Sequence, residues 1–342
     1  MSKQEKIKAF DFIRAISVLM IIMFHFISMI VRNGGGSWSE YKLISPMGSI
    51  GVSFFIIISG AGLYISSQNW KGLSNFYAKR FKAIFPTFWF VYFIMSCILF
   101  ICAGRVYIGS DVYRWAITIT GFDGYLSWYI PTYYVVGEWF IGFILLIYLV
   151  FPIIRMSLNA NKAATFIASI AVAIAAFTYN KELSGFSPIF NANAVWNPLV
   201  RLPEFIYGAI IADMMINRSR WMIYMVAVSL IYLIISVTTF DNLDKGFYSV
   251  PSLCAMFTII AFLYSKLKVR DSIYDVIAFF STSSFIAFLI HHKIIGIYSL
   301  HVHVDYKNHV AVYLYMCSVL LTVFALSYFI SKPLKYVNAC FR

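Results

Sequence analysis

An arginine and a histidine stand in one long apolar segment near the start of the chain. The segment runs from Phe10 to Phe26 and holds Arg14 near its beginning and His25 near its end. A guanidinium binds phosphate or carboxylate groups, and an imidazole accepts a proton near neutral pH. On an α-helix this offset is roughly three turns, which places the two side chains within about 20° of one another and about 16 Å apart along the axis.

This spacing suits a donor that is anionic at one end and reactive at the other. An ionisable side chain in hydrocarbon is costly unless it meets a partner, water or a substrate. With Arg14 holding the anionic head, an acyl thioester on a long pantetheine arm would carry its reactive end toward His25. The alternative is structural: Arg14 extends to the membrane interface, and His25 hydrogen-bonds to another helix. The two residues alone leave both interpretations open.

The elements that must position this pair are membrane-spanning helices. The chain has 342 residues, is 61% hydrophobic and 12% charged, and has a mean hydropathy of +0.79. Such a composition excludes an ordinary soluble domain. Apolar segments long enough to span a bilayer recur along the chain. We therefore predict an all-α, polytopic membrane helix bundle with about ten transmembrane helices, at 10–31, 47–66, 83–103, 138–154, 163–179, 201–216, 221–238, 248–265, 275–299 and 310–330.

The distribution of cations predicts the orientation of the bundle. The formal net charge is +13, but lysine and arginine concentrate in alternate connections, which argues against a nucleic-acid partner. With the N-terminus inside, each cytoplasmic connection is basic, as the positive-inside rule requires. We therefore expect cytoplasmic termini and a single domain over residues 1–342. We also expect the first segment to stay in the mature chain, because no small-residue cleavage site follows His25.

Aromatic residues are abundant in the loop from Gly104 to Gly137. Tryptophan and tyrosine suit a sugar, but they also form ordinary interfacial belts, which is the interpretation we favour. Glu138 follows this loop at the entrance of the next span. It is either a functional carboxylate or a marker of the membrane interface.

Histidines gather late in the chain, but no metal site is expected. Four residues that resemble a ligand set stand in one loop without cysteine or helical spacing: His301, His303, Asp305 and His309. His291 and His292 are adjacent, and adjacent helical residues project about 100° apart. We therefore expect only one of them, His291, to face the first helix.

Six sequence features stand in a characteristic order along the chain. The first is an arginine and a histidine separated by ten residues, at Arg14 and His25. The others are GVSFFIIISG at 51–60, KRFKAIFP at 79–86, WFIGFILLIYLVFP at 139–152, RLPEFIYG at 201–208 and FLIH at 288–291. Each feature alone is weak. Together, and over nearly the full length, they resemble acyltransferase family 3, the integral membrane acyltransferases that modify bacterial surface glycans.

The chain departs from the family pattern at three positions. Ala83 replaces a second arginine, which reduces the basic phosphate-binding set, while Lys82 beside it supplies a charge. Ile144 stands where longer members carry a glutamate, so the chain resembles the short branch without an appended extracellular domain. Ser331 replaces a common glutamate and changes no expectation.

The resemblance implies transfer of an acyl group, usually acetyl, from cytoplasmic acyl-CoA to a hydroxyl group of a surface polysaccharide or lipid-linked glycan. His25 is then the general base or, alternatively, a nucleophile that forms an acyl-imidazole. Arg14, Lys79, Arg80 and Lys82 are expected to hold the phosphates of acetyl-CoA. The expected catalytic set comprises His25, Arg14, Arg201, Glu204 and His291.

Arg201 and Glu204 are three residues apart, so on a helix they share a face and can form an ion pair.

The resemblance also implies partners and a location. The expected partners are acyl-CoA, a glycan acceptor and membrane lipids, and the expected location is the bacterial cytoplasmic membrane. An alternative from another class is a glycan exporter or flippase, in which Arg14, His25 and Arg201 line a substrate path. An alternative within the enzyme class is succinyl transfer.

Overall fold

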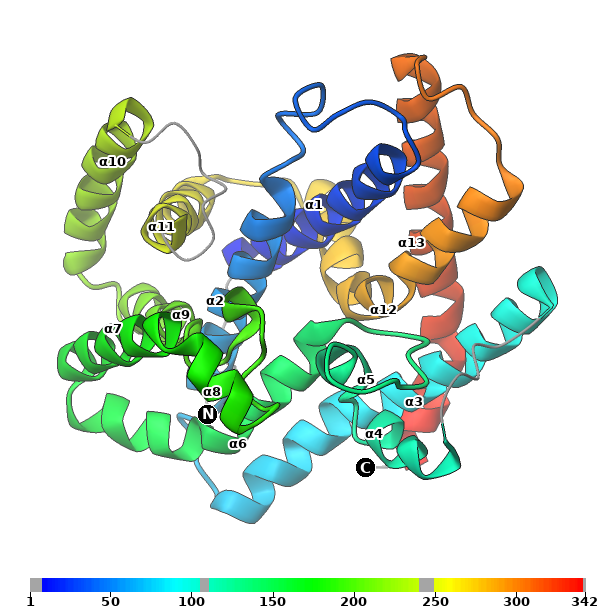
Figure 1. The fold of residues 1–342 in the computed structure, drawn as a ribbon. Coiled ribbons are helices and arrows are strands. Elements are labelled where there is room, and N and C mark those ends of the chain that lie inside the picture. The colour runs from blue at the N-terminus through cyan, green and yellow to red at the C-terminus, as the bar shows by residue number, and fades with distance from the viewer. Residues whose placement is uncertain (1–7, 105–110, 240–248, 341–342) are drawn as a thin grey trace.

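The computed structural model describes residues 8–104, 111–239 and 249–340. The regular elements within these described ranges are all helices, which confirms the predicted all-α class (Figure 1). An α-helix pairs its backbone N–H and C=O groups within one segment, which is why apolar segments that enter lipid adopt this form.

Each of the ten apolar segments predicted from the sequence forms a helix. They are α1 (Lys8–Arg32), α2 (Met47–Ser66), α3 (Leu73–Ala103), α6 (Trp139–Ala160), α7 (Lys162–Thr178), α9 (Leu202–Ile216), α10 (Trp221–Thr239), α11 (Val250–Lys266), α12 (Asp271–His301) and α13 (His309–Cys340). Shorter helices lie between them: η1 (Val112–Arg114), α4 (Trp115–Ile119), α5 (Asp123–Leu126), α8 (Asn180–Phe186) and η2 (Ala194–Trp196).

Six helices are long and apolar enough to cross a membrane: α1, α2, α3, α6, α12 and α13. The helices α7 and α8 count as a seventh candidate span if they are taken together, although they are bent by 79° relative to one another. The helices α10 and α11 are apolar but shorter. Because a helix needs about 20 residues to span the hydrocarbon, the predicted count of about ten spans is not confirmed for the described part of the chain.

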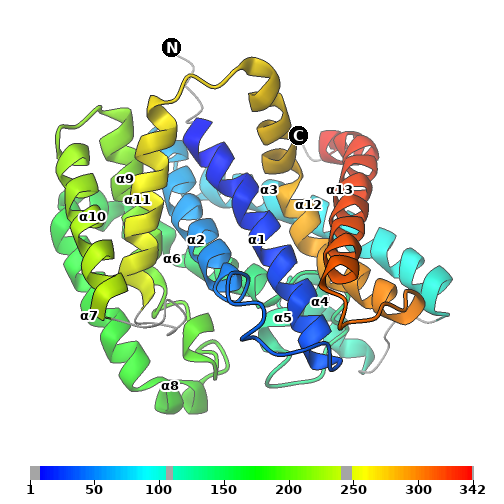
Figure 2. The ribbon, with the colours of Figure 1, turned by 90° about the horizontal axis from the view of Figure 1, so that it is seen from above.

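The helix α1 lies near the centre of the bundle, between two groups of helices (Figure 2). Its first turns, with Phe10 and Ile13, join a buried apolar cluster with residues of α2, α6, α9 and α11. Its later turns, with Ile22 and Phe26, join a second cluster with residues of α3, α12 and α13. Neighbours therefore hold α1 along its length, which fixes the positions of Arg14 and His25.

The helices α2 and α9 approach each other at backbone distance. A β-carbon at Gly60 would overlap the Phe205 carbonyl oxygen, and one at Gly208 would overlap the Ile57 carbonyl oxygen. Small residues at helix crossings are typical of membrane proteins, where close backbone packing drives association. This contact fixes the start of α9, which contributes to the site described next.

Candidate active site

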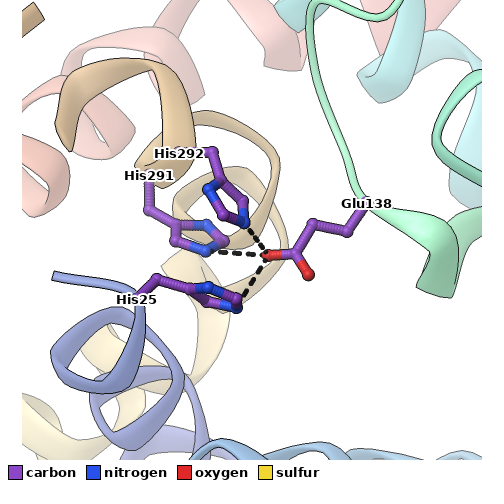
Figure 3. A group of neighbouring side chains, drawn as sticks. All are labelled: His25, Glu138, His291 and His292. Carbon is purple, nitrogen blue, oxygen red and sulfur yellow. Dashed lines mark ion pairs between the residues drawn. The ribbon is translucent and has the colours of Figure 1, made fainter. Parts of the chain in front are cut away.

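Three histidines converge on one carboxylate oxygen (Figure 3). The Nε2 atoms of His25, His291 and His292 lie 3.2, 3.0 and 2.8 Å from Oε1 of Glu138. The His25 ring centroid is 5.2 Å from that of His291 and 4.2 Å from that of His292. We call these four residues the histidine cluster. It combines three proton-accepting side chains with one carboxylate.

The cluster draws on three elements that lie far apart in sequence. His25 belongs to α1, the two other histidines belong to α12, and Glu138 immediately precedes α6. The Gly137 N–H donates to the Leu289 carbonyl over 3.1 Å, which ties the loop before α6 to α12. Gly137 has φ +73°, a left-handed backbone conformation that glycine adopts readily. This anchored loop presents Glu138 to α12.

The rings of both adjacent histidines of α12 lie close to His25 of α1, so the prediction that only His291 faces the first helix is wrong. Both histidines also reach Glu138. Successive helical residues do project about 100° apart. The carboxylate oxygen, however, enters from the end of another helix and lies within reach of both imidazoles (Figure 3). Glu138 is 7% exposed. Its place within the cluster favours a functional carboxylate over a marker of the interface.

A cavity of about 450 Å³, which we call the histidine cavity, opens beside the cluster. His25, Glu138 and His292 line it. Trp139 and Trp196 also line it, with their ring centroids 5.2 Å apart and their planes within 6° of parallel. Flat apolar faces beside a few polar groups are typical of small-molecule sites. His25 of α1 and His292 of α12 are therefore accessible to a bound molecule.

Arg14 lines a second cavity of about 540 Å³, which we call the arginine cavity. Its guanidinium lies 3.4 Å from the Asp11 carboxylate and donates to the Ser281 hydroxyl over 3.3 Å. Tyr148 also lines the cavity. The Arg14 side chain is 35% exposed. It is thus positioned by protein contacts and still able to meet an anionic ligand.

Aromatic side chains stand between the two cavities. Phe140 and Phe288 line the arginine cavity, with ring centroids 5.5 Å apart. The Phe288 ring also lies 5.7 Å from the His291 ring, and Phe140 lies 6.0 Å from Trp139 of the histidine cavity. A molecule that extended from one cavity to the other would have to move this layer.

The predicted pair of Arg201 and Glu204 forms. The Arg201 Nε lies 3.0 Å from Oε2 of Glu204, and both side chains are buried. Arg201 also donates from Nη2 to the Ser53 hydroxyl over 3.0 Å. The pair therefore joins the start of α9 to α2, and Arg201 contributes a cation to the lining of the histidine cavity.

Lys79, Arg80 and Lys82, which precede the predicted span 83–103, lie on a helix. Because α3 begins at Leu73, its early turns carry Lys79, Arg80 and Lys82. The lysines of this set are exposed, and Arg80 is half-buried. Ala83 follows directly and lines the arginine cavity. The predicted span 83–103 excludes these cations because the apolar run alone defines it, but an amphipathic start also extends a helix.

Asp123 in α5 is a buried carboxylate in the loop region before α6. It is 1% exposed, and burial raises its pKa to about 6, although the hydrogen bond that it accepts from Thr118 opposes this shift. The native state therefore holds the Asp123 proton more tightly than the unfolded chain does. The resulting stabilisation is complete below the ordinary pKa of 3.8 and is lost as the pH rises through about 6.

We expect an Asp123→Asn variant to lack this pH dependence. The free energy of unfolding of the wild-type protein, relative to that of the variant, should fall by about 2 kcal/mol between pH 4 and pH 7, since each unit of pKa shift corresponds to about 1.4 kcal/mol. Thermal unfolding in detergent over this pH range measures the difference. A difference that is constant with pH would contradict the prediction.

Comparison with known proteins identifies the family. The model of acyltransferase family 3, described as an acyltransferase domain, matches residues 7–331. No curated protein and no solved structure matches the chain. The matched range covers nearly the whole chain and includes the histidine cluster and Arg14. The chain therefore belongs to acyltransferase family 3 and is a multi-pass membrane acyltransferase.

Proposed function

We propose that this acyltransferase moves an acetyl group from cytoplasmic acetyl-CoA to a hydroxyl group of a surface polysaccharide or lipid-linked glycan, in the bacterial cytoplasmic membrane. The proposal rests chiefly on His25, which contacts Glu138 at the wall of one cavity, while Arg14 of the same helix lines another. This arrangement supplies a proton acceptor and an anion-binding group at the two ends that a CoA thioester requires.

The donor is proposed to enter the arginine cavity from the cytoplasm, with both chain termini on that side of the membrane. Arg14, together with Lys79, Arg80 and Lys82 at the start of α3, would bind the CoA phosphates. The pantetheine arm would then displace the aromatic layer and deliver the thioester to His25.

The acceptor is proposed to occupy the histidine cavity. The stacked pair Trp139 and Trp196 offers a flat face for a sugar ring, and Arg201 offers hydrogen-bond donors to its hydroxyl groups. These groups would place one hydroxyl beside His25. The cavity volume of about 450 Å³ suits a mono- or disaccharide unit of a longer glycan.

In the proposed reaction His25 takes the proton from the acceptor hydroxyl group. At the same time the hydroxyl oxygen attacks the thioester carbonyl carbon. The carbon–sulfur bond then breaks, and the CoA sulfur leaves with the proton that His25 returns. Glu138 holds the His25 ring and stabilises its protonated form, as carboxylates do in other histidine-based acyl transfers. Acylation of His25 itself would give the same products in two steps. Acyl transfer is preferred to export because the family is one of acyltransferases.

Purified protein incubated with radiolabelled acetyl-CoA and glycan or lipid-linked glycan fractions tests the proposal. We expect label in an alkali-labile ester and release of free CoA thiol in equal amount. Radiolabelled succinyl-CoA, offered under the same conditions, should transfer more slowly. Faster succinyl transfer would overturn the choice of acyl group, and failure of every glycan fraction to accept label would overturn the choice of acceptor.

Arg14→Ala is expected to raise the KM for acetyl-CoA at least about tenfold with little change in kcat. Hydrogen bonds to charged groups contribute about 1.5–3 kcal/mol, and about 1.4 kcal/mol is a factor of ten. Initial rates at varied acetyl-CoA concentration measure the effect. Arg270→Ala, which changes an exposed arginine at the start of α12, is the matched control. An equal rise in KM for both variants would exclude Arg14 from donor binding.

A further inference from the structure

The contact between His291 and Glu138 lacks the proton that it requires. His291 Nδ1 lies 2.8 Å from the Phe288 carbonyl oxygen, which only accepts, so Nδ1 carries the ring proton. In neutral His291 a lone pair at Nε2 then faces the lone pairs of Glu138 Oε1 over 3.0 Å. Both atoms are buried and have no hydrogen-bond partner. A positively charged species between them would resolve this contact.

Two more imidazoles share the same oxygen. The ligand-forming atoms of His25, Glu138, His291 and His292 all lie within 4.8 Å of one another. A single proton can satisfy one nitrogen–oxygen pair, whereas one metal ion satisfies several donors at once. Imidazole nitrogens with a carboxylate oxygen are ligands that zinc and similar divalent ions take in proteins. The donor set therefore favours a metal ion over a shared proton.

The hydrogen bond from His291 Nδ1 to the Phe288 carbonyl also fits a metal ligand. Histidines that bind metals usually donate the proton of the second ring nitrogen to a carbonyl or carboxylate, which fixes the ring and directs the free nitrogen to the ion. The Gly137–Leu289 backbone hydrogen bond holds Glu138 against the same helix. Two of the converging groups are thus oriented before any ion binds.

The loop histidines considered in the sequence analysis lie apart from this cluster. His301 Nε2 lies 3.0 Å from the Cys102 carbonyl oxygen, and His309 pairs with Glu40 over 3.9 Å. Among the residues that the structure describes, the histidine cluster is the group of side chains arranged to hold an ion.

We propose that Glu138, His291 and His292 bind a divalent metal ion of the zinc class, with His25 beside its open fourth position. Catalytic zinc sites commonly have three protein ligands and one exchangeable position. His25 makes the longest of the three contacts to Glu138, 3.2 Å, and comes from a different helix from the other histidines. The histidine cavity provides the entry path, since Glu138 and His292 line it. The ligand atoms would close to about 2.0–2.2 Å from the ion.

The proposed ion deepens the proposed function, on which its catalytic role rests. A metal ion lowers the pKa of a bound hydroxyl group and makes it a better nucleophile. The acceptor hydroxyl would bind at the fourth position, and His25 would take its proton as the oxygen attacks the thioester carbon. His25 then acts as the base without being a permanent ligand.

Elemental analysis of the purified, tag-free protein tests the metal site. After incubation with ZnSO₄ and removal of unbound ions, we expect about one zinc per chain, the occupancy of one such site. Glu138→Gln, His291→Gln and His292→Gln should each lower the zinc content at least about tenfold at a fixed free zinc concentration, as loss of a ligand predicts. His25→Gln should retain zinc and lose acyl transfer. His303→Gln, which changes an exposed histidine, should retain both.

Each outcome decides a separate point. No bound zinc in the wild-type protein would overturn the metal site and leave a proton shared within the cluster. Equal loss of zinc from His25→Gln would overturn the three-ligand arrangement. Acyl transfer by protein shown to be metal-free would overturn the catalytic role of the ion while the proposed function stands. Bound zinc without acyl transfer to any glycan would instead count against the proposed function alone.

Discussion

His25→Ala is expected to lower kcat/KM for acyl transfer by about 10²–10⁴-fold, the usual contribution of a general base. The imidazole lies at the histidine cavity, 3.2 Å from the Glu138 carboxylate that orients it. Removing it deletes the proton acceptor while the other members of the cluster remain. Initial rates of label transfer from acetyl-CoA, at equal amounts of folded protein, measure the effect.

The controls for His25→Ala separate catalysis from folding. His303→Ala changes an exposed histidine and should keep the wild-type rate. The space left by the missing imidazole adjoins the histidine cavity, so added imidazole should restore part of the activity of His25→Ala. A variant that retained more than about a tenth of the wild-type rate would lie outside the range for a lost general base and would exclude this role for His25.

The helices were predictable because apolar runs of this length have few alternatives to a helix in lipid. The bounds of α2, Met47–Ser66, agree with the prediction because Pro46 precedes its apolar run and the polar residues Ser67 and Gln68 follow it. The start of α3 lies ten residues before its predicted position because residues 73–82, which include KRFK, continue the helix beyond the apolar run. The number of spans was less predictable, since apolarity alone does not distinguish a crossing helix from a short buried one such as α9.

The site was predictable where its geometry is local to one helix. Arg14 and His25 follow from helical spacing, and so does the Arg201–Glu204 pair. The positions of Glu138 and His292 depend on tertiary contacts, because the loop that carries Glu138 is tied to α12 by the Gly137–Leu289 hydrogen bond. No spacing in the sequence encodes that contact. The two adjacent histidines in the sequence point to this part of α12 as a site. Only the direction from which the Glu138 carboxylate approaches shows that both imidazoles contact it.

The largest expected effect on stability is at the crossing of α2 and α9. Gly60→Ala places a methyl group on the Phe205 carbonyl, and Gly208→Ala places one on the Ile57 carbonyl. Overpacking usually costs about 1–3 kcal/mol, and these contacts should reach or exceed the upper value because a backbone cannot rotate aside as a side chain does. Each variant should therefore unfold at a clearly lower temperature in detergent. Its activity should also fall, because a smaller amount of the protein is folded.

Gly62→Ala is the matched control for this prediction, because it lies on the same helix as Gly60 but a β-carbon there meets nothing within 4 Å. It should be neutral or stabilising by up to about 1 kcal/mol, since alanine stabilises a helix more than glycine does.

The double variant Gly60→Ala/Gly208→Ala should lose less stability than the sum of the single losses, because the first methyl group already separates the helices. Additive losses, or a Gly60→Ala variant as stable as Gly62→Ala, would show that α2 and α9 do not depend on this close approach. Because Arg201 at the start of α9 lines the histidine cavity and binds Ser53 of α2, helix separation at this crossing would also displace a wall of the active site.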